Sequence, residues 1–304
     1  MVSLYLHHFD ASPFAEKVRI ALGVKELEWS SVQIPMIMPK PDLTVLTGGY
    51  RKTPVLQIGA DIYCDTQRIA AELENRFARR TLFPQNTRTL ASVIAAWSDS
   101  DLFRPGAGLS MGTNLDLPEA VLADRFAFFD FLDRETLPAQ IPNLFAQFRA
   151  ALQRIEDMLS ERGPFLLGEH PGWADAACYA PVWMCRGNIK GAEGLIARLP
   201  ALQAWERRVV KIGHGSPVES SAEEAIEVAR AATSSVETEV SSDAWPALEA
   251  GQAVTVTPDD YGSVPVQGEL VRLTQEDIAV RREHHRTGEV VVHFPRLGYK
   301  VEKQ

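Results

Sequence analysis

The sequence predicts an α/β segment with a mixed sheet, followed by an all-α domain and a small β-rich extension. Three observations predict this fold class. Strand and helix patterns alternate over residues 1–84, apolar residues recur with helical period over 85–215, and short strand candidates separated by turns run to residue 304. We therefore expect three domains, 1–84, 85–215 and an acidic extension 216–304 that combines a helix with a small β-meander.

The first segment alternates between the two kinds of pattern. The expected elements are strand 3–9, helix 13–23, strand 28–34, a proline-rich loop over 35–52, strands 54–58 and 62–64, and helix 66–79. The two short strands form a hairpin that turns at Gly59-Ala60-Asp61. The order βαβ and then ββα requires a mixed sheet with helices packed on it.

The remainder of the chain is first helical and then rich in strands. Helices are expected near 87–103, 119–134, 138–162, 173–187, 199–211 and 219–236. The strands expected in the extension are 253–257, 269–274, 278–282 and 289–294. Turn signals at 258–262, Gly268 and Thr287-Gly288 separate these strands, which is typical of a β-meander or half-barrel.

Charge and composition narrow the classes of partner. The chain carries 31 basic and 40 acidic residues, a formal net charge of −9. From residue 216 onward there are 8 basic and 16 acidic residues, so the extension carries −8 and the rest −1. An acidic tail on a nearly neutral body disfavours nucleic acid and anionic membranes as partners. No apolar stretch approaches the roughly 18–20 residues of a membrane span.

The sequence favours a reducing, cytoplasmic location. The N-terminus lacks the pattern of a signal peptide. The chain has three cysteines, Cys64, Cys178 and Cys185, an odd and sparse set that argues against a disulfide framework. His284 and His285 adjoin several arginines, and a metal site there would require converging carboxylates or further histidines, so we expect none.

Ser12 and Pro13 open the first predicted helix. Serine is a favoured N-cap and proline a favoured first helical residue, so a purely structural cap is one interpretation. The same geometry has a chemical use, because a hydroxyl and exposed N–H groups at a helix N-terminus stabilise an anion such as a thiolate. A free thiol has a pKa of about 8.5, and this setting lowers it. Ser12 is therefore the candidate catalytic residue, as a hydrogen-bond donor to a bound thiolate.

Thr53, Pro54 and Val55 introduce a predicted strand after a loop. A trans proline that merely starts the strand is one interpretation. A cis bond would instead turn the backbone N–H and C=O of Val55 outward, where they could pair with a peptide ligand as a short added strand.

Asp65 and Thr66 lie between a predicted strand and a predicted helix. Helix capping is again one interpretation. As a binding site, Thr66 and the nearby N–H groups would receive a carboxylate, and Asp65 would hold an ammonium group. Together the three sites suit a ligand with a thiol, peptide bonds and an amino-acid head, and glutathione has all of these groups.

These segments resemble the glutathione transferase superfamily. The stretch from Ser12 to Leu22, SPFAEKVRIAL, is similar to the first helix of the tau, zeta and omega classes. Thr53-Pro54-Val55-Leu56 resembles the cis-proline segment of the family, and the stretch from Cys64 to Ile69, CDTQRI, resembles its Glu-Ser helix start with Asp and Thr instead. The resemblance covers about residues 1–213. It implies a thioredoxin-like N-terminal domain, an all-helical second domain and a homodimer.

The resemblance also implies a reaction and further site residues. Ser12 takes the catalytic position, and a serine cannot form the mixed disulfide that the omega-class cysteine forms. This implies a transferase or isomerase that uses glutathione as co-substrate against a small electrophile. Lys40 lies where related enzymes place a basic residue near the glycine carboxylate of glutathione. Arg51 and Lys52 are alternatives for that role. Each of these three residues could instead be a solvated charge in the loop.

Two features depart from the family pattern. Gly172 stands where the second domain of the family usually has a serine or threonine cap, and Asp175 is left as the partner for the N–H groups. The acidic extension of about 90 residues is also unusual. The extension suggests an alternative function, a non-catalytic interaction protein that keeps the fold and binds a partner through residues 216–304.

Overall fold

The computed structural model describes residues 3–244 and 246–304. Its contacts divide the chain into two compact units. The first unit combines Met1–Ala15, Glu28–Glu72 and Pro217–Gln304, and the second combines Glu16–Leu27 and Leu73–Ser216. The three domains expected from the sequence, with boundaries at residues 84 and 215, stay a prediction. The predicted fold class is confirmed, because an α/β segment precedes a helical segment and a β-rich extension.

The first unit contains a sheet to which both ends of the chain contribute. Its strands are β1 (Tyr5–His8), β2 (Glu28–Gln33), β3 (Val55–Ile58), β4 (Asp61–Cys64), β5 (Ser216–Ser220), β6 (Glu239–Val240), β7 (Ala253–Pro258), β8 (Val266–Leu273), β9 (Asp277–His284), β10 (Gly288–Pro295) and β11 (Tyr299–Lys303). Their order across the sheet is β11-β7-β8-β9-β10-β4-β3-β1-β2-β5, and β6 pairs with β8. β5, β6 and β11 were not predicted from the sequence.

The parallel pairing of β10 with β4 connects the extension to the N-terminal strands. Strands β7 to β10 follow one another as an antiparallel meander, as the sequence predicts. β10 then pairs with β4, with Val291 opposite Asp61 and His293 opposite Tyr63. The meander therefore continues the N-terminal sheet. The apolar run in β10 is buried throughout, which is typical of a strand between two neighbours.

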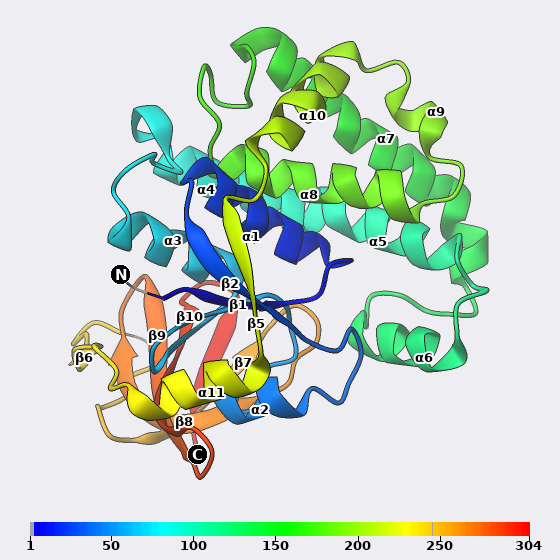
Figure 1. The fold of residues 1–304 in the computed structure, drawn as a ribbon. Helices are drawn as coiled ribbons and strands as arrows, with labels where there is room; N and C mark the ends of the chain where they lie inside the picture. The colour runs from blue at the N-terminus through cyan, green and yellow to red at the C-terminus, as the bar shows by residue number, and fades with distance from the viewer. Residues whose placement is uncertain (1–2, 245) are drawn as a thin grey trace. The chain divides into compact units, whose positions relative to one another are not determined.

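One face of this sheet is covered by a helix from each part of the unit. Helices α2 (Pro41–Thr47) and α11 (Ala222–Ala231) contact each other and both contact β10, as Figure 1 shows. The expected loop over 35–52 was therefore wrong at 41–47. Pro41 at the first helical position and Gly48 at the left-handed end, with φ of 78°, are the sequence signals for this helix.

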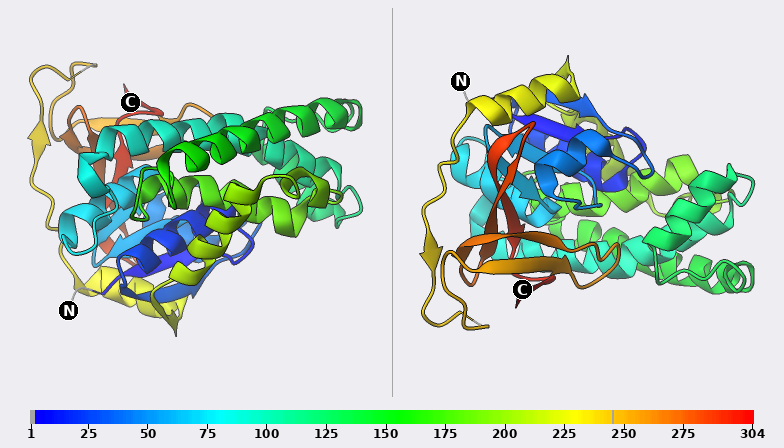
Figure 2. Two further views of the ribbon diagram at one scale, coloured as in Figure 1. Left: turned by 90° about the horizontal axis from the view of Figure 1, so that it is seen from above. Right: turned by 90° about the horizontal axis from the view of Figure 1, so that it is seen from below.

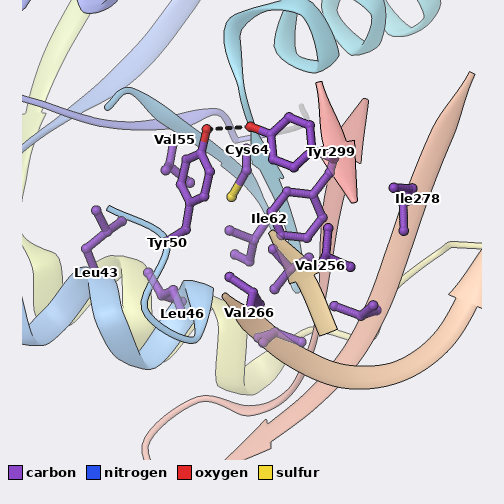
Figure 3. Close-up of a cluster of buried hydrophobic side chains, with 14 of the residues drawn as sticks. Leu43, Leu46, Tyr50, Val55, Ile62, Cys64, Val256, Val266, Ile278 and Tyr299 are labelled. Carbon is purple, nitrogen blue, oxygen red and sulfur yellow. Dashed lines mark hydrogen bonds between the residues drawn. The ribbon is translucent and has the colours of Figure 1, made fainter. Parts of the chain in front are cut away.

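The core under these helices draws on sequence segments that are far apart. Figure 3 shows Leu43 and Leu46 of α2 packed near Val55 of β3 and Ile62 of β4, together with side chains of the extension. Successive side chains in a strand point to opposite faces. Accordingly Val290, Val292 and Phe294 belong to this core, whereas Val291 packs with Val271 and Ala279 on the other face.

The second unit is helical. Its helices are α4 (Arg88–Trp97), α5 (Phe103–Gly112), α6 (Glu119–Phe128), α7 (Leu137–Arg162), α8 (Trp173–Asn188), α9 (Glu193–Ile196) and α10 (Pro200–Ile212). A π-helical turn, Ser98–Leu102, connects α4 to α5, and α7 packs along α5 (Figure 2). Helices α1 (Pro13–Val24) and α3 (Thr66–Arg76) contribute residues to both units. Within the described chain, no helix combines the length and apolar character that a membrane span requires.

Asp175 fixes the start of α8. Its carboxylate accepts hydrogen bonds from Leu166 N, Gly172 N and Trp205 Nε1 at 2.9, 3.0 and 2.8 Å. Gly172 is extended and lies so close to Leu82 that a Cβ atom would meet the Leu82 carbonyl oxygen at 2.6 Å. Close backbone approach therefore explains the glycine at this position, and Asp175 supplies the capping bond as the sequence suggested.

Candidate functional site

The sheet register gathers the three predicted sites at one edge. His7 of β1 lies opposite Val55 of β3, and Val55 lies opposite Cys64 of β4. Because both pairs are antiparallel, β1 and β4 end at the edge where β3 begins. The loop to Ser12 leaves from this edge, Pro54 enters at it, and Asp65 follows β4 directly. Residues that are up to about fifty positions apart in sequence thus meet at one place for a topological reason.

Ser12 caps helix α1. Its Oγ accepts a hydrogen bond from Ala15 N at 3.2 Å, and its own N–H donates to Phe9 O at 3.1 Å. The side chain is buried. The capping bond uses an oxygen lone pair and not the hydroxyl proton, so the same serine can cap the helix and donate to an anion. The structural and the chemical interpretation of Ser12 are therefore compatible.

Lys40 and Thr53 meet at the loop before β3. Lys40 Nζ donates to Thr53 Oγ1 at 2.9 Å and lies 5.4 Å from the ring centre of Phe9. The Thr53-Pro54 bond is cis, and Val55 is fully buried as the first residue of β3. The lysine that the resemblance places near a glycine carboxylate is thus a buried residue attached to the loop, and not a solvated charge.

Asp65 and Thr66 form the start of helix α3. Asp65 has a φ of 74°, and its Oδ1 accepts from Gln67 N at 2.9 Å. An aspartate tolerates this left-handed conformation better than most residues because its short side chain hydrogen-bonds locally. Thr66 is buried as the first residue of the helix, whose N-terminal N–H groups suit a carboxylate.

The structure adds residues that sequence reasoning missed. Tyr299 of β11 donates to Asp65 Oδ2 at 3.1 Å and shares a hydrogen bond of 2.8 Å with Tyr50 (Figure 3). Lys52 forms an ion pair with Asp260 and lies 4.6 Å from the ring centre of Tyr261. No local pattern could identify these partners, because each contact joins residues more than 200 positions apart.

The buried thiol near the site is not a second candidate nucleophile. Cys64 precedes Asp65 and lies in the core, between Tyr50 and Ile62 in Figure 3. Burial, together with the charge of Asp65, raises the pKa of the Cys64 thiol well above its usual value. A thiol of this kind stays protonated and unreactive at neutral pH. Cys178 and Cys185 are also free and buried, in α8.

Two side chains of α5 are buried, and one in the turn before it is exposed. Phe103 and Met111 are buried, Met111 in a cluster with Leu122 and Leu137. Asp101 is exposed in the π-helical turn. Among the residues that the structure describes, no three histidine, cysteine or acidic side chains come together in a way that could hold a metal ion.

Two family models match this chain. The glutathione S-transferase N-terminal domain matches residues 6–81, and the glutathione S-transferase C-terminal domain matches residues 138–208. The first match contains all of the candidate site residues. Comparison with curated protein sequences gave no match.

Solved structures extend the likeness to the whole chain. A GST-like protein from Pseudomonas syringae is 38% identical, with all of both chains covered and a TM-score of 0.83. A glutathione S-transferase from Rhodospirillum rubrum is 20% identical over 68% of this chain and 87% of that chain, with a TM-score of 0.53. A rice GST in complex with glutathione is 23% identical over 73% and 92% of the two chains, with a TM-score of 0.53. Of these three structures, the Pseudomonas protein is the one whose match includes the C-terminal extension.

Proposed function

This chain belongs to the glutathione S-transferase superfamily, and on that premise we propose that it binds glutathione and activates its thiol for attack on a small electrophile. The observation that carries the proposal is the register His7–Val55–Cys64, which gathers Ser12, Val55 and Asp65 at one edge of the sheet. These positions offer an anion-stabilising helix start, a backbone for peptide pairing and a site for an amino-acid head group. Glutathione carries the three complementary groups.

Ser12 and the start of α1 would stabilise the thiolate. The hydroxyl proton of Ser12 would donate to the sulfur while its oxygen continues to cap the helix. The partial positive charge of the helix N-terminus adds to this hydrogen bond. Because Ser12 is buried, both interactions act where water screens them little. The ionised sulfur then attacks the electrophile, as in nucleophilic addition, substitution or isomerisation.

The remaining residues would hold the rest of the tripeptide. Val55 would pair with the cysteinyl backbone, Thr66 and the start of α3 would take the γ-glutamyl carboxylate, and Asp65 would take its ammonium group. Lys40, which is buried and donates a hydrogen bond to Thr53, is proposed for the glycine carboxylate. Since the catalytic position is a serine, transfer or isomerisation is favoured over thiol–disulfide exchange.

We also propose a homodimer in the cytoplasm. Dimers are common in the family, and three free, buried cysteines suit a reducing compartment. Sedimentation measurements would test the first statement, and fractionation of cells would test the second.

A matched pair of variants tests the role of Ser12. Glycine at an N-cap costs only a few tenths of a kcal/mol, so Ser12→Gly removes the hydroxyl with little loss of helix stability. We expect turnover of an electrophile panel to fall about 10²-fold and the ultraviolet absorbance of bound thiolate to disappear. Ser221→Gly is the control, because Ser221 caps α11 with a similar bond of 3.0 Å. Unchanged turnover in Ser12→Gly would remove this residue from the mechanism.

The alternative is a non-catalytic protein that binds a partner through the extension. It predicts that the intact chain turns over no electrophile, whether or not calorimetry detects binding of glutathione. It also predicts that substitutions on the exposed surface of residues 216–304 abolish partner binding. Turnover by the wild-type chain that depends on Ser12 would exclude this alternative as the whole function.

A further inference from the structure

The C-terminal extension reaches the edge of the sheet that carries the candidate glutathione site. β10 runs parallel to β4, so both strands end at the edge where Asp65 follows β4. The chain then turns back and enters β11 at Tyr299, which lies opposite Pro258 of β7. Topology thus brings Tyr299 to Asp65 although the two are 234 residues apart.

Tyr299 and Tyr50 form a directed chain of hydrogen bonds that ends on Asp65. Tyr299 Oη lies 3.1 Å from Asp65 Oδ2 and 2.8 Å from Tyr50 Oη. Figure 3 shows the second of these bonds as a dashed line. An ionised carboxylate only accepts, so the Tyr299 proton points to Asp65 and Tyr50 donates to Tyr299. Burial raises the pKa of both tyrosines well above its usual value. Both hydroxyls therefore stay protonated as donors.

These bonds leave Asp65 oriented but not saturated. Oδ1 accepts from Gln67 N and Oδ2 accepts from Tyr299, which fixes the plane of the carboxylate. An ionised carboxylate has about four acceptor positions, so about two remain for a cation. A group that is already oriented loses less conformational entropy when its ligand arrives.

The extension also holds the loop on the other side of the site. Lys52, two residues before Pro54, forms an ion pair with Asp260 in the turn after β7, and its ammonium group lies over the ring of Tyr261. Tyr50 in the same loop bonds to Tyr299. Both the cis-proline loop and Asp65 are therefore attached to residues of the extension.

We infer that Tyr299 is a positioning residue for glutathione, which orients the Asp65 carboxylate to receive the ammonium group of the γ-glutamyl moiety. This inference rests on the proposed function of the site. It assigns the extension a role in ligand binding. The hydroxyl of Tyr299 then contributes to binding of the γ-glutamyl ammonium group and not to binding of the rest of glutathione.

The test compares two ligands in Tyr299→Phe. Calorimetry would measure the Kd of glutathione and of N-glutaryl-cysteinylglycine, which lacks only the γ-glutamyl ammonium group. We expect the variant to bind glutathione about tenfold more weakly and the analogue as well as the wild type does. In turnover, the KM for glutathione rises by a similar factor while kcat stays within about twofold. Tyr50→Phe, which keeps the Tyr299–Asp65 bond, should show the same pattern with a smaller effect.

Tyr5→Phe is the matched control. Tyr5 also donates to a carboxylate of the extension, Glu224 Oε1, at 3.1 Å, but it lies away from Asp65 in the first strand. We expect its Kd for both ligands to equal that of the wild type.

The outcomes separate the inference from the proposed function. Equal weakening of both ligands in Tyr299→Phe would show a general disturbance of the fold and would overturn the inference, as would unchanged binding of glutathione. If the wild-type chain itself binds neither ligand, the proposed function fails and the inference fails with it.

Discussion

Asp61 and His293, which are 232 residues apart in the chain, share a buried hydrogen bond of 2.9 Å between neighbouring strands. Asp61 also accepts bonds from Ser234 Oγ and from Ser235 N, so it attaches the segment after α11 to the sheet. Burial raises the pKa of Asp61, but the hydrogen bonds from His293 and Ser234 outweigh it and lower the pKa below its usual value. This carboxylate joins the extension to the N-terminal strands.

Asp61→Ala should destabilise the first unit by about 2–4 kcal/mol. The variant leaves the buried imidazole of His293 and the half-buried hydroxyl of Ser234 without their acceptor, and unpaired buried polar groups are costly. Urea unfolding and hydrogen exchange of the β10 amides would measure the loss. Asp259→Ala, which removes an exposed carboxylate in the same unit, is the control and should stay within about 0.5 kcal/mol. Equal midpoints for the two variants would contradict the assignment.

His7 should make the first unit less stable as the pH falls from about 6.5 to about 4. Burial lowers the pKa of His7 to about 4, and Gln57 is its hydrogen-bond partner at 2.9 Å. Gln57 Nε2 donates to Gly59 O and Ala225 O, so its Oε1 accepts from His7 Nε2–H. The unfolded chain binds a proton in this window and the folded chain does not, so stability is lost as pH falls. The difference between 6.5 and about 4 corresponds to about 3 kcal/mol.

Comparison of the wild type with His7→Gln isolates this effect. Urea unfolding at pH 7 and pH 4.5 should give a smaller pH dependence in the variant, because glutamine does not titrate. If the free energy of unfolding depends on pH equally in the two chains, His7 does not stay neutral in the folded protein.

Asp175 should have the opposite pH dependence. Burial raises its pKa to about 6, against hydrogen bonds from Leu166, Trp205 and Gly172 that lower it. The folded state therefore binds more protons than the unfolded state between about 4 and 6, and stability falls as pH rises through this window. Asp175→Asn should remove this dependence of the free energy of unfolding on pH. Fluorescence of Trp205, whose indole donates to Asp175, would follow unfolding in both chains, and a slope that persists in Asp175→Asn would contradict the assignment.

Two glycines, Gly172 just before α8 and Gly187 inside it, should respond in opposite directions to alanine. Gly172→Ala places a Cβ atom 2.6 Å from the Leu82 carbonyl oxygen, a backbone atom, and should cost about 1–3 kcal/mol. Gly187 lies in the last turn of α8, with nothing within 4 Å of a Cβ atom built there. Gly187→Ala should therefore stabilise by about 0.5–1 kcal/mol. Thermal unfolding of both variants measures the two signs, and a tolerated Gly172→Ala would show that the backbone contact is not tight.

The candidate site was predictable where its signals are local. A serine before a proline marks a helix start at Ser12, and Asp65-Thr66 marks another between a strand and a helix. Each depends on a few neighbouring residues, and the structure confirms both helix starts. Helix α2 was missed although its proline and glycine bracket it, because the prolines of the surrounding segment were interpreted as loop signals.

The sequence by itself determined the types of element, the family resemblance and the residues that could carry the chemistry, because periodicity, caps and turns act over a few positions. The tertiary structure alone decided that β10 pairs with β4 and that Tyr299 reaches Asp65. Strand pairing depends on backbone hydrogen bonds and on a shared apolar face, which any strand of suitable pattern can supply, so the choice between partners more than 200 residues apart is made only when the whole core packs.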